Sequence, residues 1–316
     1  MLFIVYVNDG LLMLNSAKLL KKRKTAFLNI WEAHDMGPVQ EYLGFQITRN
    51  HVKHSMVLHQ RPYVLKVLKH FQMENVKHVC TPLPAGYQPS TAPKDYNASP
   101  TTRQWYQSVI GSLLFVMLGT RPDIAFAIIK MSQFMANLTE EHLLKALHIV
   151  KYLGSTPNLV LHFSGGASSL DCYSDSDWAG DSEVMLSFLA MTWLAGDLAD
   201  NQQWLCPQQR LSTCNCTQQI LWIKSLFQEC HLSLQHFMMF GDNKGTIHIV
   251  QNPVMEGRSK HIDIKYYFLR EYVEKQTFML DYVPTDQQKA DMMMKNLTGQ
   301  KFQDNRSWLN LLEFKS

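Results

Sequence analysis

The sequence lacks an apolar run long enough to cross a membrane. A membrane-spanning helix needs about 20 consecutive apolar residues, whereas the opening run Met1–Val7 stops at Asn8 and Asp9. There is no signal peptide either. Because the chain starts inside an apolar run, with no capping or polar residue before it, we expect a truncated piece of a longer protein and no membrane partner.

The cysteine spacing of a zinc knuckle is also missing. Six cysteines occur, but Cys214-Asn215-Cys216 has the wrong spacing for a Cys-x-x-Cys pair, and no paired Cys-x-x-Cys or His-x-x-x-His follows. We therefore expect reduced, mostly buried thiols in an intracellular protein. The sequence does not distinguish the cytoplasm from the nucleus.

A strong excess of charge of either sign is absent. Charged residues make up 18% of the sequence and hydrophobic residues 46%, and the formal net charge is +3. This composition predicts a globular protein, and 316 residues leave room for two domains, each with its own core. The small positive charge permits nucleic-acid binding through a local groove without requiring it.

Hydrophobic patterning in the first half predicts a hairpin followed mainly by helices. Apolar runs on both sides of Asn8-Asp9 predict a strand hairpin with a polar tip. The next expected elements are a helix over 18–30, paired strands over 42–48 and 55–59, and a helix over 62–71. Five prolines between Cys80 and Thr101 then predict an extended linker.

Three further helices are expected, over 105–118, from Pro122 to about 135, and from Thr139 to 153. Thr120-Arg-Pro-Asp123 is typical of a helix start, and Thr139 is the expected cap of the third helix. We expect His142 and His148 to be partly exposed helix residues rather than ligands.

From residue 159 strands and helices alternate, which predicts a mixed α/β (α+β) fold. The expected strands cover 159–163, 172–177, 186–194, 236–240 and 277–283. The expected helices cover 218–228, 245–251, 262–273 and 286–297.

Three aspartates of this second half are candidate metal ligands. Four aspartates lie within residues 171–181, and Asp175 and Asp177 point to the same side of an extended strand, where they repel unless a cation lies between them. With Asp242 at a later strand end and Asp291 in a C-terminal helix, Asp175 can form an oxygen-lined pocket for two Mg²⁺ ions that clamp a phosphodiester. Spacing alone leaves a second interpretation open, in which these are solvated turn and helix residues.

Several short motifs occur in the order found in one family. They are Tyr6-Val-Asn-Asp9, where the family has Tyr-Val-Asp-Asp, Tyr42-Leu-Gly-Phe-Gln-Ile-Thr-Arg49, Gly119-Thr-Arg-Pro-Asp-Ile124, Tyr173-Ser-Asp-Ser-Asp-Trp-Ala-Gly180, Gly241-Asp-Asn243, Lys260-His-Ile-Asp-Ile264, and Val283-Pro-Thr285 with Ala290-Asp291. No block is specific alone. As an ordered set they resemble the polyprotein of copia-type LTR retrotransposons, from the end of the reverse transcriptase through the ribonuclease H (RNase H) domain.

The resemblance covers nearly the whole chain and implies a division into four parts. Residues 1–80 would be a partial reverse transcriptase palm, and residues 81–165 a linker with a helical thumb or connection. Residues 166–300 would form an RNase H-like mixed sheet with flanking helices, followed by a C-terminal tail at 301–316.

In this family both aspartates of Tyr-Val-Asp-Asp bind the catalytic metals of the polymerase. Here Asp9 remains as a catalytic residue, but the neutral Asn8 stands in the first place. The fingers and an earlier palm aspartate would precede the start of this chain, so we expect no DNA synthesis unless another chain supplies the missing palm and fingers.

For RNase H, the resemblance assigns three of four catalytic, metal-binding acids to Asp175, Asp242 and Asp291. The fourth, a glutamate of the Ser-Thr-Glu-Ala-Glu-Tyr motif, has no counterpart in Leu211-Ser-Thr-Cys-Asn-Cys-Thr217, and an ungapped alignment puts Gln209 in its place. Losing one ligand predicts a rate lower by roughly a thousandfold or more. Two alternatives remain: weak Mg²⁺- or Mn²⁺-dependent cleavage of RNA in RNA–DNA hybrids, or a non-catalytic nucleic-acid-binding protein derived from a retroelement.

Two basic patches are candidate nucleic-acid contacts. The resemblance places Arg258, Lys260, His261 and Lys265 near the phosphates of an RNA–DNA hybrid, although a solvated helix face is the alternative. The second patch lies within residues 18–24. It would be near template and primer in a whole polymerase, or it is a plain exposed helix start.

Overall fold

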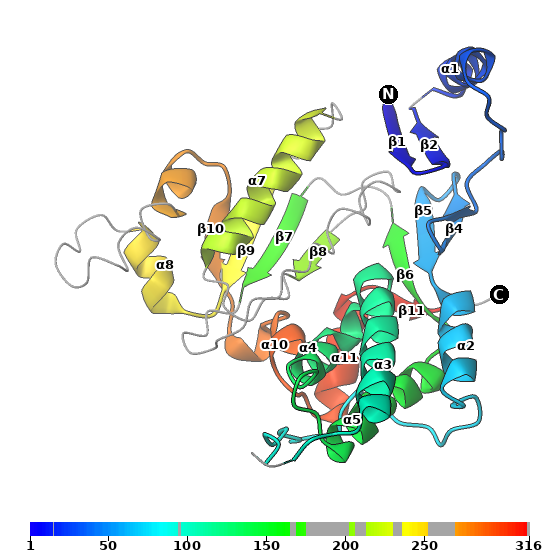
Figure 1. Ribbon diagram of the computed structural model, residues 1–316. Helices are drawn as coiled ribbons and strands as arrows, with labels where there is room; N and C mark the ends of the chain where they lie inside the picture. The colour runs from blue at the N-terminus through cyan, green and yellow to red at the C-terminus, as the bar shows by residue number, and fades with distance from the viewer. Residues whose placement is uncertain are drawn as a thin grey trace.

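The computed structural model describes residues 1–14, 16–93, 96–164, 169–174, 202–205, 213–229, 236–251 and 269–314. Helices and strands are mixed along the chain, which confirms the predicted α/β class (Figure 1). The strand expected over 186–194 lies outside these residues, and the helix expected over 262–273 is described only from residue 269.

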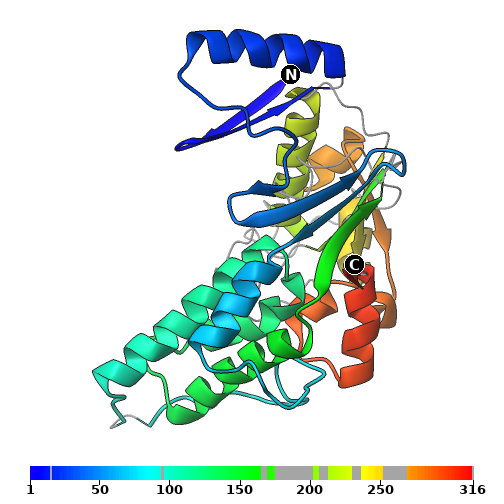
Figure 2. The ribbon, with the colours of Figure 1, turned by 90° about the vertical axis from the view of Figure 1, so that its right-hand side faces the viewer.

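The N-terminal hairpin is present as predicted. Strands β1 (Leu2–Tyr6) and β2 (Asp9–Met13) are antiparallel, with Tyr6 opposite Asp9. Helix α1 (Ala17–Ile30) follows, and Phe27 of α1 packs edge-on against Phe3 with ring centroids 5.1 Å apart. Both ribbon views place this unit at one end of the molecule (Figures 1 and 2).

An antiparallel sheet in the order β11-β6-β5-β4-β3 joins distant parts of the chain. Its strands are β3 (Glu41–Tyr42), β4 (Phe45–Asn50), β5 (Ser55–His59), β6 (Leu159–Ser164) and β11 (Leu311–Glu313). The single strand expected over 42–48 is wrong, because Leu43 and Gly44 have φ of 51° and 81° and form a turn between β3 and β4. Residues expected in the C-terminal tail supply β11, and the four-part division of the chain stays a prediction.

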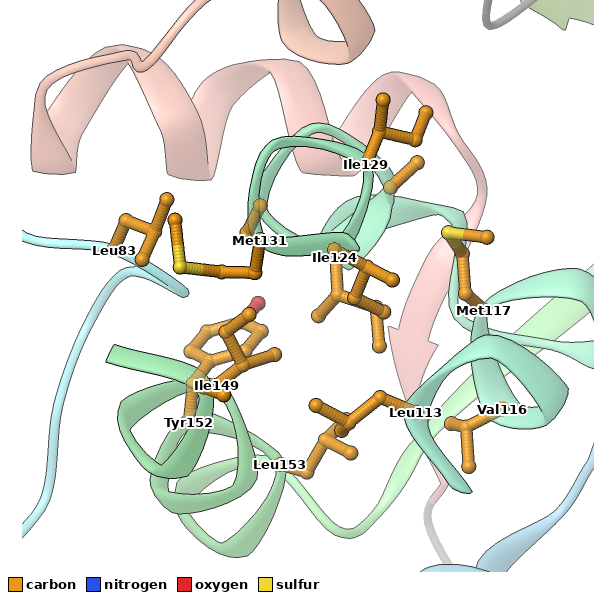
Figure 3. Close-up of a cluster of buried hydrophobic side chains, with 14 of the residues drawn as sticks. Leu83, Leu113, Val116, Met117, Ile124, Ile129, Met131, Ile149, Tyr152 and Leu153 are labelled. Atoms are coloured by element: carbon orange, nitrogen blue, oxygen red, sulfur yellow. The ribbon is translucent and has the colours of Figure 1, made fainter. Parts of the chain in front are cut away.

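Helices pack into the main hydrophobic core beside this sheet. They are α2 (Arg61–His70), α3 (Pro100–Gly119), the 3₁₀ turn η1 (Pro122–Ile124), α4 (Ala125–Ser132), α5 (Glu140–Ser155), α10 (Asp291–Met294) and α11 (Gly299–Trp308). Figure 3 shows side chains of α3, α4 and α5, such as Leu113, Met131 and Tyr152, meeting in this core. The helices predicted over 62–71, over 105–118 and from Thr139 to 153 are confirmed. The helix predicted from Pro122 is instead the turn η1 followed by α4, which ends at Ser132 rather than near 135.

The cap of α5 is confirmed, but one histidine prediction is wrong. The Thr139 hydroxyl accepts from the backbone N–H of His142, and Nδ1 of His142 accepts from the backbone N–H of Thr139. His142 is fully buried: its ring stacks on Phe134 with centroids 4.0 Å apart, and its Nε2 lies 2.9 Å from the carbonyl oxygen of Ser90. His148 is partly exposed, as predicted.

The described residues of the Pro-rich segment up to Ser99 form neither helix nor strand, as predicted, whereas Pro100 and Thr101 begin α3. The segment is nevertheless fastened to the core. Leu83 is buried in the helical core, and the side-chain amide of Asn296 donates to the Pro84 carbonyl at 2.8 Å. The segment is therefore packed irregular chain rather than a free linker.

Gly119, at the end of α3, has no room for a side chain. An added Cβ would collide with the side-chain amide of Gln60, which is buried and accepts a hydrogen bond from the Thr120 hydroxyl at 3.1 Å. We expect Gly119→Ala to lower the free energy of unfolding by about 1–3 kcal/mol through overpacking.

Gly111 of the same helix provides the matched control. It is exposed, and no atom lies within 4 Å of an added Cβ, so Gly111→Ala should stabilise the helix by about 0.5–1 kcal/mol. Urea unfolding of both variants tests this difference, and equal effects at the two positions would contradict the close packing at Gly119.

A second sheet is formed by the C-terminal half. Its described strands are β7 (Ser169–Ser174), β8 (Gln202–Leu205), β9 (His236–Gly241) and β10 (Met279–Tyr282), all pairing in parallel in the order β10-β9-β7-β8. Helices α7 (Thr213–Glu229) and α8 (Lys244–Gln251) accompany them. Strands β7, β9 and β10 and helices α7 and α8 agree with the predicted elements of this half, whereas β8 was not predicted.

The two faces of β7 meet different cores. Cys172 packs with Ile220 and Phe227 of α7, whereas the next residue, Tyr173, belongs to the main helical core. The sheet therefore lies between α7 and the elements after β10. The single helix expected over 286–297 is wrong: the 3₁₀ turn η2 (Thr285–Gln287) and the short α10 are separated by Gln288, whose ψ of 107° is extended.

Candidate functional site

Two adjacent parallel strands end at the candidate metal site. Ser174, the last residue of β7, lies opposite Gly241, the last residue of β9. Asp175 and Asp242 directly follow these two residues in the sequence. Asp242 is half-buried, whereas Asp175 lies outside the described residues. The carboxyl ends of parallel strands form one edge of a sheet, where ligands of α/β proteins commonly bind.

The segment leading to Asp291 is fastened to the same edge. The fully buried Gln288 donates from Nε2 to the carbonyl oxygen of Ser174 at 3.1 Å. The backbone N–H of Val283 donates to the carbonyl oxygen of Gly241 at 2.9 Å. These two bonds hold the chain before Asp291 against the ends of β7 and β9.

Asp291 itself is paired with lysines. Its side chain is 3% exposed, and Nζ of Lys295 lies 2.7 Å from Oδ1 while Nζ of Lys301 lies 3.5 Å from Oδ2. Both carboxylate oxygens are thus held by ammonium groups, and a metal ion at Asp291 would have to displace them. The assignment of Asp291 as a metal ligand stays a prediction.

The remaining predicted residues are not brought together. Asp9 is exposed at the start of β2. The pKa of Tyr42 is raised mainly by the partial burial of Tyr42 and secondly by the negative charge of Asp9. Within the described residues no three His, Cys, Asp or Glu side chains gather as a possible metal site. The predicted set of Asp175, Asp242 and Asp291 stays a prediction, because Asp175 lies outside those residues. The predicted nucleic-acid contacts Arg258, Lys260, His261 and Lys265 lie outside the described residues.

The start of α7, where the family resemblance predicts the fourth carboxylate, carries no acid. The first turn of α7, which begins at Thr213, contains no acidic residue. The only acid of the helix is Glu229, its last residue, which at 1.5 Å per residue lies about 24 Å along the axis from the first turn. Gln209, the alternative position, lies outside the described residues.

Sequence reasoning missed a lysine held between aromatic rings on the second face of the sheet. Nζ of Lys289 lies 4.7 Å from the ring centroid of Tyr173 and 5.6 Å from that of Trp308. Burial lowers the pKa of Lys289 and raises that of Asp171, and on both groups burial outweighs their mutual attraction. Burial also raises the pKa of Tyr173 to about 12. Alternation along β7 predicts that Asp171 and Tyr173 share a face, but no sequence signal brings Lys289 there.

The known proteins similar to this chain include Pol polyproteins of plant retrotransposons. The retrovirus-related Pol polyprotein from transposon TNT 1-94 of Nicotiana tabacum is 30% identical over 322 residues, which cover 96% of this chain and 24% of that protein. The Pol polyproteins from transposons RE1 and RE2 of Arabidopsis thaliana are 31% and 29% identical over 312 residues, 95% of this chain and 21% of each relative. No protein-family model matches, and no solved structure matches significantly.

These similarities show that the chain is a retrotransposon-derived protein. Because the match extends over nearly its whole length, it belongs to the family of Pol polyproteins of copia-type retrotransposons. The chain spans about a quarter of the length of the relatives it matches. Among the described residues, no helix is both long and apolar enough to cross a membrane.

Proposed function

We propose that this chain is the reverse transcriptase–RNase H part of a Pol polyprotein, that it has lost both catalytic activities, and that it keeps nucleic acid as its partner. The observation that carries the proposal is the start of α7, where the family has its fourth RNase H carboxylate and this helix has no acid. The adjacent ends of β7 and β9, which precede Asp175 and Asp242, support the RNase H-like assignment of residues 166–300.

The missing glutamate has a large expected effect on cleavage. Four carboxylates balance two divalent cations in such a site, and they position both the attacking water and the leaving oxygen. With three carboxylates the expected loss is about a thousandfold or more in rate, or about 4 kcal/mol of transition-state stabilisation. The ion pairs of Asp291 with Lys295 and Lys301 add to this loss, because they compete with any metal ion for the same oxygens.

Loss of the polymerase activity is proposed from Asn8. This residue lies in the exposed turn between β1 and β2, directly before Asp9. A neutral amide cannot supply the negative charge that the family's first aspartate gives to a metal ion. Val5 and Tyr6 are each 59% exposed and Val7 is 80% exposed, so the hairpin offers an open apolar surface to a partner segment.

One substrate tests both losses. A dye-labelled RNA template annealed to a shorter DNA primer with a second dye is given to the purified protein with nucleotides and Mn²⁺. We expect no RNA cleavage above the level of the Asp175→Asn variant and no primer extension above the level of a sample without protein, because the carboxylates assigned to both metal sites are incomplete.

The two readouts separate the two activities. RNA cleavage by the wild-type protein that disappears in Asp175→Asn would contradict the loss of RNase H activity, and primer extension would contradict the loss of polymerase activity. Circular dichroism shows that each sample is folded, and an active RNase H and an active reverse transcriptase show that the substrate is intact. Binding of the same duplex without metal, weaker at higher salt, is the expected remaining property.

A further inference from the structure

The positive charge of the protein is concentrated on one helix. Helix α1 carries five cations within residues 18–24 and no acid along its length. The formal net charge of the whole chain is +3, so without these five cations it would be −2. The rest of the chain is therefore slightly acidic in sum, so α1 is a local concentration of positive charge that attracts a polyanion.

Most of these cations are available to a partner. Lys24 pairs with Asp35 at 2.6 Å, whereas Lys18, Lys21, Lys22 and Arg23 are exposed and have no ion pair among the described residues. Lys18, Lys21 and Lys22 occupy positions i, i+3 and i+4, so they share one helix face and repel one another. An anionic partner lying along this face would remove that repulsion.

Part of the apolar face of α1 is covered by the hairpin, whereas Leu19 and Ile30 are exposed. Leu20, Phe27 and Leu28 are half-buried, and Phe27 packs against Phe3 of the hairpin. A helix that lies in a membrane surface inserts its apolar face among lipids, whereas Phe27 of this helix packs against the hairpin. The arrangement favours a partner that contacts only the cationic face, at the outer end of the molecule (Figure 2).

We propose that α1 binds the sugar–phosphate backbone of nucleic acid, as a contact separate from the RNase H-like half. The inference rests on the proposed function for its class of partner. It assigns the affinity to Lys18, Lys21, Lys22 and Arg23, which approach phosphates without reading bases. Each neutralised phosphate releases counterions, so these four contacts contribute about 3 to 4 units to the dependence of log affinity on log salt for a duplex.

The test compares two variants of equal net charge. The first replaces Lys18, Lys21, Lys22 and Arg23 with Gln. The control replaces four exposed lysines elsewhere with Gln: Lys53, Lys66, Lys69 and Lys77. Both changes remove four positive charges, and Gln is a good helix former, so unchanged circular dichroism is expected for both.

Binding is measured by fluorescence anisotropy with a labelled RNA–DNA hybrid, in a series of KCl concentrations without divalent cations. We expect the α1 variant to bind at least tenfold more weakly at low salt and to lose about 3 to 4 units of salt slope. The control variant should change by only a few-fold.

Each other result overturns the inference in a distinct way. If the wild-type protein binds and the α1 variant binds equally well, or if both variants weaken alike, α1 is not the contact while the proposed function stands. If the wild-type protein binds no nucleic acid, the partner in the proposed function fails as well. Binding to phosphatidylserine vesicles that is lost in the α1 variant, without nucleic-acid binding, would assign the helix to a membrane surface instead.

Discussion

Replacing Asp123 with Ala is expected to lower the free energy of unfolding by about 3–5 kcal/mol, because it leaves a buried guanidinium without its partner. The side chains of Arg121 and Asp123 are 2% and 0% exposed. Nε and Nη2 of Arg121 donate to the two carboxylate oxygens of Asp123 at 2.9 and 2.8 Å. Burial lowers the pKa of Arg121, but the carboxylate more than reverses this, so the guanidinium stays charged.

The pair also fastens neighbouring elements to one another. Arg121 donates to the carbonyl and hydroxyl oxygens of Thr156, directly after α5. The Tyr152 hydroxyl of α5 donates to Asp123 at 2.7 Å and accepts from Arg306 of α11 at 3.2 Å. Loss of the carboxylate therefore removes a bond from Tyr152 as well as the counter-charge of Arg121.

Urea unfolding measures the effect, and two variants control for it. The double change Arg121→Met with Asp123→Leu removes both charges and is expected to cost less than Asp123→Ala alone, because a buried pair replaced by apolar groups leaves no orphan charge. Asp304→Ala removes an exposed acid of α11 and should stay within about 0.5 kcal/mol of the wild type. A cost below about 1 kcal/mol for Asp123→Ala would contradict a tightly desolvated pair.

This ion pair marks a limit of sequence-based prediction. Thr120-Arg-Pro-Asp123 correctly predicted a helix start, since a proline in the first turn is a local signal. It did not predict that Arg121 and Asp123 are buried, because Thr156 and Arg306 lie far along the chain and only the tertiary fold brings them close. Local sequence signals locate a helix or strand. The burial of its side chains depends on contacts with residues far along the chain, which these signals do not predict.

The same distinction applies to the candidate site. Strand-end positions for Asp175 and Asp242 follow from the alternation of strands and helices, and the parallel pairing of β7 with β9 brings those ends together. Asp291 and Lys295 are four residues apart, which is a spacing that allows an ion pair on a helix and can be read from the sequence. The contact with Lys301 and the bond from Gln288 to Ser174 depend on how α11 and the segment after β10 fold back.

The second large effect on stability is expected from truncating Phe302 of α11, near the C-terminus. This side chain is 5% exposed, lies in the main helical core and meets Tyr152 edge-on with ring centroids 5.7 Å apart. Truncating a buried phenylalanine to Ala costs about 3–5 kcal/mol, from lost burial and the cavity left behind. We expect a loss of that size for Phe302→Ala in urea unfolding.

Gln303, the next residue, is exposed on the same helix and gives the matched control. Gln303→Ala should change the free energy of unfolding by less than about 0.5 kcal/mol, since it removes no packed side chain. If Phe302→Ala were equally mild, residues 301–316 would behave as the tail that the family resemblance implies. A large difference between the two would instead make α11 part of the helical core. Truncating one ring costs several kcal/mol only where that ring is packed inside the core.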